Sequence, residues 1–302
     1  PWASWQIAAL LGTAVVLFAL FAVVERRAPD PVLPFAAFRL REVAVSNVGN
    51  TLFGVCMFGL SSYVPLYVQG VRGESAAGAG AVLTPQMVAW SVMALLSGRL
   101  YVRIGYRATA LLGVTCIALG IAPLTFITAD TPLPLIMVGM ALAGLGFGNA
   151  STAFLLAPQS AVPWNMRGAV TSSTQFARTI GGAVGVALLG AALNARLAPA
   201  VQEEDVLASA LLTPAARAAL PADAVQRLVE AMADGLHRTY LALLVVALAG
   251  VANVVLFAQR SPKSPPTTPA ADRPVGAANG AASAAETRAA AASREVAAPS
   301  RR

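Results

Sequence analysis

Residues 133–194 read LPLIMVGMALAGLGFGNASTAFLLAPQSAVPWNMRGAVTSSTQFARTIGGAVGVALLGAALN. They contain two apolar segments, 133–157 and 168–193, joined by the short polar turn 163–168. At about 1.5 Å rise per residue, each segment is long enough to cross a hydrocarbon core of about 30 Å. The stretch therefore predicts two membrane-spanning helices joined as a hairpin.

Both arms of this hairpin carry glycines at helical spacing. Bare backbone on one helix face lets two helices approach closely in lipid, so we predict helix packing at Gly144, Gly148, Gly181, Gly182 and Gly185. The second arm also places Gln175 and Arg178 at apolar depth. Such groups are costly in lipid and usually face a protein interior or an aqueous path, so the hairpin is typical of a transport pathway.

The rest of the chain has the same character. Hydrophobic residues make up 57% of the 302 residues and charged residues only 12%, about half the charge of a soluble domain. Continuous runs of about 20 apolar residues predict helices rather than a β-barrel. We predict an all-α membrane protein, a polytopic transmembrane helical bundle of about seven spans, at 5–24, 43–68, 78–100, 108–128, 133–157, 168–193 and 240–257.

The net charge of +7 comes from arginines that cluster at the ends of the apolar runs. This pattern indicates membrane topology and not nucleic acid binding. Most of these arginines fall on the cytoplasmic side if the first span ends inside, which also leaves the C-terminus inside. Cys56 and Cys116 lie in different spans without metal-ligand spacing, and no span offers a Ser/His pair or paired Asp residues. We therefore expect neither a metal site nor an enzyme.

Composition divides the chain further. We predict a transmembrane linker helix at 1–25, a cytoplasmic amphipathic linker at 26–42, an external loop at 197–237 with an amphipathic helix at 222–236, and a disordered cytoplasmic tail at 259–302. A kink or break is expected near Pro65 and a tight turn at 98–107. The chain opens on Pro1 without an initiator Met, so we expect it to be a piece of a longer protein.

Two groups of residues resemble a known family. The first comprises Pro65-Leu66-Tyr67-Val68-Gln69, Gly73, Ser75, Gly78 and Leu83-Thr84-Pro85; the second comprises Arg167-Gly168, Gln175-Phe176-Ala177-Arg178 and Gly181 to Gly185. Together they resemble the major facilitator superfamily, and within it the fourteen-span drug:proton antiporters of the EmrB/QacA type. The resemblance implies that 43–258 is the C-terminal six-helix bundle of the major facilitator fold. It also implies a cytoplasmic loop motif at Gly98, Leu100, Arg103, Gly105 and Arg107, with Val102 where the family usually has Asp.

This resemblance implies the C-terminal half of a secondary active transporter. Its expected work is proton-coupled export of drugs or other amphipathic organic compounds across the bacterial cytoplasmic (inner) membrane, with the proton gradient as energy source and no cofactor. The implied partners are the lipid bilayer, a small organic substrate and an N-terminal bundle that this chain lacks, with a periplasmic adaptor as a further candidate. The alternative is a non-transporting membrane scaffold or truncated relic that binds a partner protein.

Polar side chains within the spans are the candidate substrate-cavity residues. These side chains either line a cavity or bond neighbouring helices. The candidates are Asn47, Asn50, Gln86, Asn149, Gln159, Gln175 and Arg178. Arg178 lies about 15 Å along its helix. It either reaches the lipid headgroups as an anchor or faces the bundle interior and bonds Gln or Asn side chains and freed carbonyls, and we favour the interior because Gly181, Gly182 and Gly185 mark a tightly packed helix nearby. Aromatic and Met side chains suit a broad apolar pocket or simple packing at Phe53, Met57, Phe58, Met87 and Trp90.

Overall fold

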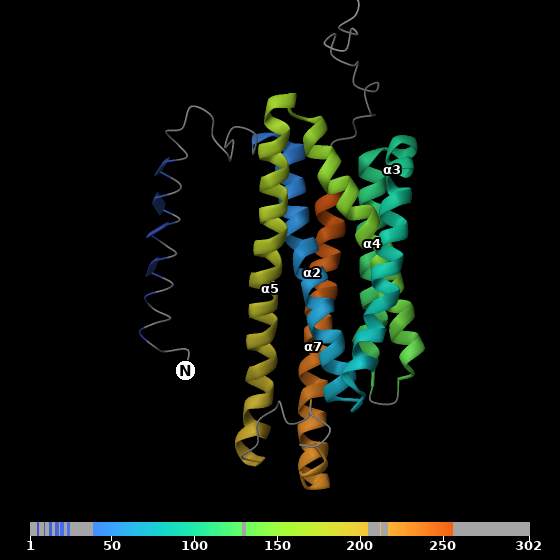
Figure 1. The fold of residues 1–302 in the computed structure, drawn as a ribbon, viewed down its shortest axis with the longest axis vertical. Helices are drawn as coiled ribbons and strands as arrows, with labels where there is room; N and C mark the ends of the chain where they lie inside the picture. Colours follow the sequence, from blue (N-terminus) through green and yellow to red (C-terminus); the bar gives the residue numbers. More distant parts are fainter. Residues whose placement is uncertain are drawn as a thin grey trace, which may run out of the picture. The chain divides into compact units, whose positions relative to one another are not determined.

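The computed structural model describes residues 39–128, 131–199, 212 and 217–255, the backbone of 200–204, and ten separate helical positions between 5 and 24. Most of the predicted linker 26–42 and the whole predicted tail 259–302 lie outside these residues. Within the described part of the chain every regular element is a helix, which confirms the predicted all-α class (Figure 1). The long helices are α2 (Arg41–Gly70), α3 (Ala76–Ile121), α4 (Leu133–Ser160), α5 (Arg167–Glu204) and α7 (Ala222–Val255). The short 3-10 helices η2 (Ala122–Phe126) and η3 (Trp164–Met166) lie at the ends of α3 and α5.

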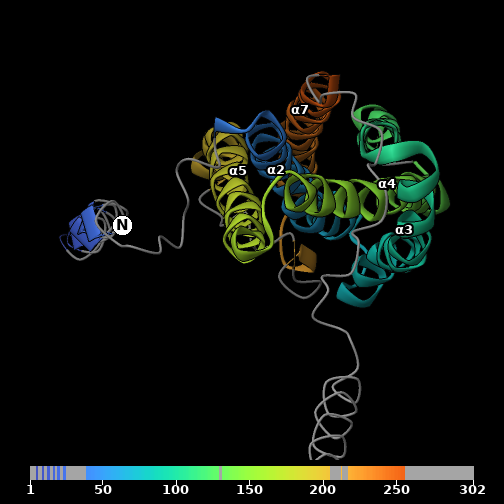
Figure 2. The ribbon, with the colours of Figure 1, turned by 90° about the horizontal axis from the view of Figure 1, so that it is seen from above.

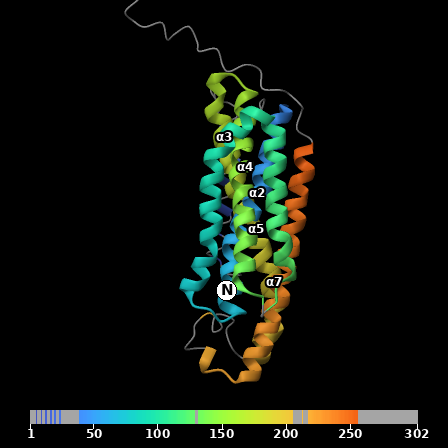
Figure 3. The same ribbon diagram turned by 90° about the vertical axis from the view of Figure 1, so that its right-hand side faces the viewer.

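Helix α3 consists of two arms that meet at Gly105. Gly105 has φ 79° and ψ 167°, a conformation that glycine adopts readily and that interrupts the helix. Figures 1 and 3 show the two arms meeting at one end of the bundle. Helical backbone continues to residue 104, so the chain reverses at Gly105 and not over the whole predicted turn 98–107. All five long helices are long and apolar enough to cross a membrane, and the reversal at Gly105 divides one of them into two arms.

Helix α4 packs against both arms of α3. A Cβ on Gly148 would lie 2.7 Å from the Cβ of Met93 in the first arm, and a Cβ on Gly113 in the second arm would lie 2.5 Å from the backbone N of Ala150. Side chains larger than hydrogen do not fit at these positions. Glycine thus brings the three helical segments close together, as expected where lipid provides no hydrophobic drive for association.

Helices α2 and α5 form a second close seam. A Cβ on Gly185 would lie 2.8 Å from Val55, and Cβ atoms on Gly54 and Gly181 would collide with backbone carbonyls of the facing helix, those of Arg178 and Thr51. The two glycine pairs of the sequence hairpin therefore face different partners. Gly144 and Gly148 face the first arm of α3, whereas Gly181 and Gly185 face α2.

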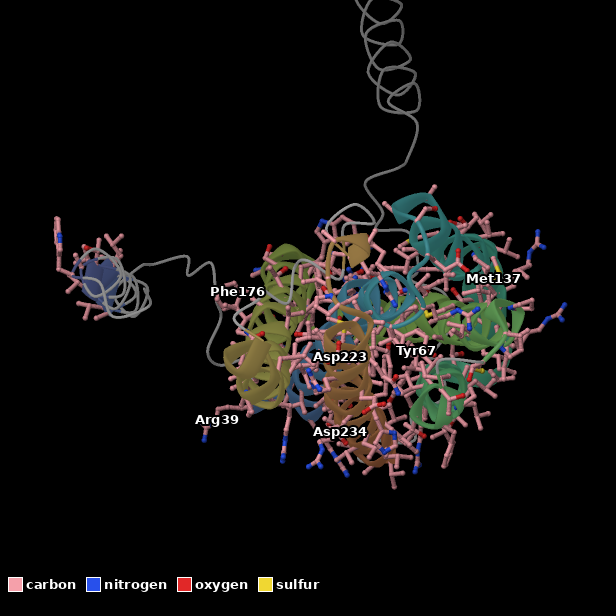
Figure 4. All side chains as sticks on the ribbon, turned by 90° about the horizontal axis from the view of Figure 1, so that it is seen from below. Arg39, Tyr67, Met137, Phe176, Asp223 and Asp234 are labelled. Carbon is pink, nitrogen blue, oxygen red and sulfur yellow. The ribbon has the colours of Figure 1, made fainter. Side chains whose placement is uncertain are left out.

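Helix α7 runs antiparallel to α2. The hydroxyl of Tyr240 donates to the carbonyl of Tyr63 over 3.0 Å, and Asn253 Nδ2 donates to the carbonyl of Val45 over 3.0 Å. Seen from above, α5, α2, α4 and α3 follow one another from left to right (Figure 2). Helix α7 lies next to α2, at the top of this view. Figure 4 shows Tyr67 inside the bundle and Phe176 of α5 at its periphery.

Side chains brace the end of the bundle where α2 stops and α4 begins. The Tyr67 hydroxyl donates to the carbonyl of Thr128, and Arg72 Nη1 donates to the carbonyl of Thr131. Arg217 Nη1 donates to the carbonyl of Gly70 over 3.0 Å. These three bonds join three segments that are distant in the sequence, 67–72, 128–131 and the residue Arg217.

The structure differs from the sequence expectations in two further places. The segment 222–236, expected as a separate amphipathic helix in the external loop, forms the first turns of α7. No Gly or Pro interrupts 236–240, and Asp234 pairs with Arg238 at i,i+4 over 3.1 Å, so the helix continues into the last span. Helix α2 likewise continues through Pro65 without a break. In a packed bundle, neighbouring helices tolerate such an interior proline.

Candidate functional site

The candidate site lies where α2, α5, α4 and the first arm of α3 come together. Its polar members are Asn50 of α2 and Arg178 of α5, and its aromatic members are Phe53 of α2, Trp90 of α3 and Phe147 of α4. Residues from four separate helices thus form one connected cluster, in which Asn50 and Phe53 contact the charged side chain of Arg178 and the other two rings contact Phe53. Such convergence of a few polar groups with aromatic rings is typical of a ligand site in a helical bundle.

Arg178 is held by an amide. Its Nε and Nη2 donate to Oδ1 of Asn50 over 3.3 and 3.1 Å. Asn50, only 1% exposed, is itself oriented because its Nδ2 donates to the carbonyl of Ser46 one turn back over 3.0 Å. The remaining amide oxygen is therefore directed at the guanidinium. Arg178 is half-buried and bonds an amide across helices, as the sequence analysis predicts for a guanidinium at this depth.

An aromatic cluster adjoins this pair. The Arg178 Cζ lies 4.5 Å from the ring centroid of Phe53, within the range of a cation–π contact. Phe53 packs edge to face on Phe147, with centroids 5.0 Å apart, and on Trp90, with centroids 6.2 Å apart. Phe53 and Phe147 are buried, whereas Trp90 is half-buried. The cluster therefore connects the cation to an indole ring that remains partly accessible.

The other candidate cavity residues do not join this site by any described bond. Asn47 Nδ2 donates to the carbonyl of Val43 in its own helix, and Gln159 Nε2 donates to Thr171 Oγ1 over 2.8 Å between α4 and α5. Gln175 is exposed on α5. Gln86 and Asn149 are buried, and among the described residues neither Gln86 amide atom nor Asn149 Oδ1 has a hydrogen-bond partner. Of the seven candidates, Asn50 and Arg178 are the two that the structure brings together.

The loop-motif residues gather at the reversal of α3. Gly98 and Leu100 lie in the last turns of the first arm, Arg103 is exposed, and Gly105 has the positive φ that reverses the chain. Arg107 Nη2 donates to the carbonyl of Val255 over 3.2 Å and so ties this turn to the end of α7.

Phe147 was not among the predicted site residues. It stands between Gly146, which faces the second arm of α3, and Gly148, which faces the first arm. A large ring between two close-packing glycines lies at a helix crossing. The sequence Gly146-Phe147-Gly148 is the signal that could have indicated Phe147. Within the described ranges no three His, Cys, Asp or Glu side chains are grouped as metal ligands.

Fold and site together define a multi-pass helical membrane protein with a charged, aromatic-lined site inside the bundle. Residues 1–186 match the family model of the Major Facilitator Superfamily, and the chain belongs to this family. The superfamily consists of membrane transporters, so the chain falls among transporters rather than enzymes.

Several curated relatives are similar to this chain. Multidrug transporter protein MdtP of Bacillus subtilis is 35% identical over 195 residues, which are 65% of this chain and 36% of the relative. Multidrug resistance protein Stp of Mycobacterium tuberculosis is 32% identical over 228 residues, 75% of this chain and 40% of the relative. The tetracycline resistance determinant of Streptomyces rimosus is 29% identical over 190 residues, 62% of this chain and 55% of the relative. The chain thus spans less than two thirds of the length of these proteins.

Proposed function

We propose that this chain is the C-terminal half of a fourteen-span exporter of drugs or other amphipathic organic compounds, in the bacterial inner membrane. The observation that carries the proposal is the Arg178–Asn50 pair beside Phe53, Trp90 and Phe147, a charged and aromatic site inside membrane-length helices. The names of the relatives, multidrug transporters and a tetracycline resistance determinant, support the substrate class. The scaffold alternative gains no support from these observations.

In this proposal residues 1–25 form a linker span, 26–42 a cytoplasmic linker, 43–258 the six-helix bundle, and 259–302 a cytoplasmic tail. The external segment 197–237 of the bundle includes the end of α5 and the start of α7. An N-terminal bundle faces α2, α4, α5 and the first arm of α3. Substrate binds between the two bundles near the membrane middle, and alternating access rocks one bundle against the other. The close glycine seams support a bundle that moves as one body.

We assign proton coupling to residues outside this chain. The apolar spans of this sequence contain no Asp or Glu, and the acids of the fully described residues are Glu42, Glu74, Asp223, Glu230 and Asp234, near or beyond the ends of the spans. A proton carrier within the membrane is usually an acidic side chain or a histidine. The coupling carboxylates therefore belong to the proposed N-terminal bundle, and a periplasmic adaptor is a further proposed partner.

Efflux of ethidium tests this function. Everted vesicles with the complete transporter should accumulate the dye when a proton gradient is imposed and stop when an uncoupler removes it. Vesicles with these 302 residues alone should show no coupled accumulation, because one wall of the path and the carboxylates are missing. Coupled accumulation by the 302 residues alone, or none by the complete transporter, would contradict the proposal.

The proposed topology places the Gly105 turn, the 163–168 turn and the C-terminus in the cytoplasm. In a variant without the native cysteines, a cysteine at Asp130 should react with an impermeant thiol reagent from outside. A cysteine at Asn165 should react only after permeabilisation. The reverse pattern of labelling would refute this orientation.

A further inference from the structure

Arg178 is a half-buried cation without a described counter-ion. No Asp or Glu occurs in the apolar spans. Two of the described acids, Asp223 and Asp234, already pair with Arg227 and Arg238 on the same helix. A guanidinium at membrane depth costs about 3 kcal/mol or more unless acceptors or water surround it. A neutral amide supplies only part of that stabilisation.

The guanidinium also retains donors. Of its five N–H groups, Nε–H and one on Nη2 are directed at the single oxygen of Asn50. Among the described residues no other acceptor bonds it, and the residue is half-buried rather than enclosed. One face of the guanidinium lies against Phe53, which leaves its edge as the side on which a planar acceptor binds.

We propose that Arg178, held by Asn50, binds the carboxylate of an aromatic amphipathic substrate. This inference rests on the proposed function, because it assigns chemistry to the face where substrate is proposed to bind. A carboxylate accepts two parallel hydrogen bonds from a guanidinium, and these charge-assisted bonds are about twice as strong as neutral ones. The half-buried ring of Trp90, joined to Arg178 through Phe53, provides a stacking surface for the aromatic body of the ligand.

A matched ligand pair tests this site. The probes are 2-naphthoate and its primary amide, which have similar size and shape but differ in charge. Binding of each radiolabelled probe is measured to the 302-residue chain in lipid nanodiscs, with empty nanodiscs as background. The acid should bind the wild-type chain about tenfold or more tightly than the amide, as expected for hydrogen bonds to a charged group.

Variants locate the preference. Arg178→Gln should remove the preference for the acid, and Arg178→Lys should keep only part of it, because Lys retains the charge but loses the planar fork. Arg196→Gln is the control, since Arg196 lies exposed on the same helix and its loss removes an equal charge. Elution as a single species before and after heating verifies that each variant folds.

Equal binding of acid and amide by the folded wild-type chain, or no binding of either, would overturn the proposal. So would an acid preference that survives Arg178→Gln. The same measurement on the complete transporter tests whether a carboxylate of the N-terminal bundle occupies Arg178 instead, in which case the acid preference is lost there and the proposal fails. Loss of ethidium efflux with an intact, Arg178-dependent acid preference would refute the proposed function and leave the binding site standing.

Discussion

The α3–α4 seam and the α2–α5 seam are both packed through glycines, but they differ in their polar contacts. In both, glycines remove side chains where the helices cross, so that a Cβ would collide with the neighbouring helix. Across the α3–α4 seam the described side-chain bond is neutral, between the hydroxyls of Ser97 and Thr152 at 2.6 Å. The α2–α5 seam instead carries the guanidinium of Arg178 on Asn50. Close packing is thus common to both seams, and charge distinguishes the one that we assign to the substrate.

The largest expected effect is a loss of stability when a glycine of either seam is replaced. Gly54→Ala and Gly113→Ala should each destabilise the bundle by about 1–3 kcal/mol, because the added methyl meets backbone that cannot move aside. Thermal unfolding in detergent, followed by size-exclusion chromatography, measures this loss.

Gly80→Ala is the matched control for both glycine variants. It has open space around its Cβ and should gain up to about 1 kcal/mol from helix propensity. A loss at one seam only would show that the two seams are packed by different means.

The second effect separates the seams by function. In the complete transporter, Arg178→Lys should lower the rate of 2-naphthoate efflux about tenfold at equal membrane abundance, because Lys cannot form the proposed bidentate contact with the carboxylate. Ser97→Ala, in the neutral seam, should leave the rate near that of the wild type. Wild-type efflux from Arg178→Lys would instead identify Arg178 as an anchor without a part in transport.

The third prediction concerns the residue that bonds Arg178. Asn50→Asp places a carboxylate where the amide oxygen accepts from Arg178, and the internal ion pair should compete with an acidic ligand. We expect binding of 2-naphthoate to weaken several-fold while binding of its amide stays constant. Unchanged binding of the acid would mean that the guanidinium edge is not the ligand contact.

The smallest effect concerns the neutral seam. Ser97→Ala removes one hydroxyl of the bonded pair and should cost less than about 1 kcal/mol, the usual magnitude for such a bond between membrane helices. Thermal unfolding of Ser97→Ala and of Thr152→Ala should give similar small losses. A larger loss would indicate that the hydroxyls, and not the glycines, hold α3 to α4.

The helices could be predicted from the sequence more completely than the faces by which they pack. Apolar runs of membrane length predicted the arms of the bundle, because length and hydrophobicity alone decide whether a segment crosses lipid. They did not predict that α7 continues through 236–240 or that the chain reverses at Gly105, since both depend on single local conformations. The amide partner of Arg178 was predicted by type, but its position was not. Asn50 is distant in the sequence, and helices that are apolar on every side carry no pattern that tells which faces meet.

The three bonds at the α2–α4 end of the bundle have a mechanical consequence. Tyr67, Arg72 and Arg217 each bond a backbone carbonyl of another segment, so these bonds do not depend on the side chain that the carbonyl residue carries. Substitutions at Thr128 or Thr131 would leave the acceptors in place, whereas a side chain at Gly70 would collide with Met232. These bonds therefore hold the segments at this end of the bundle together. We expect a rotation of any one of these segments to rotate the others with it.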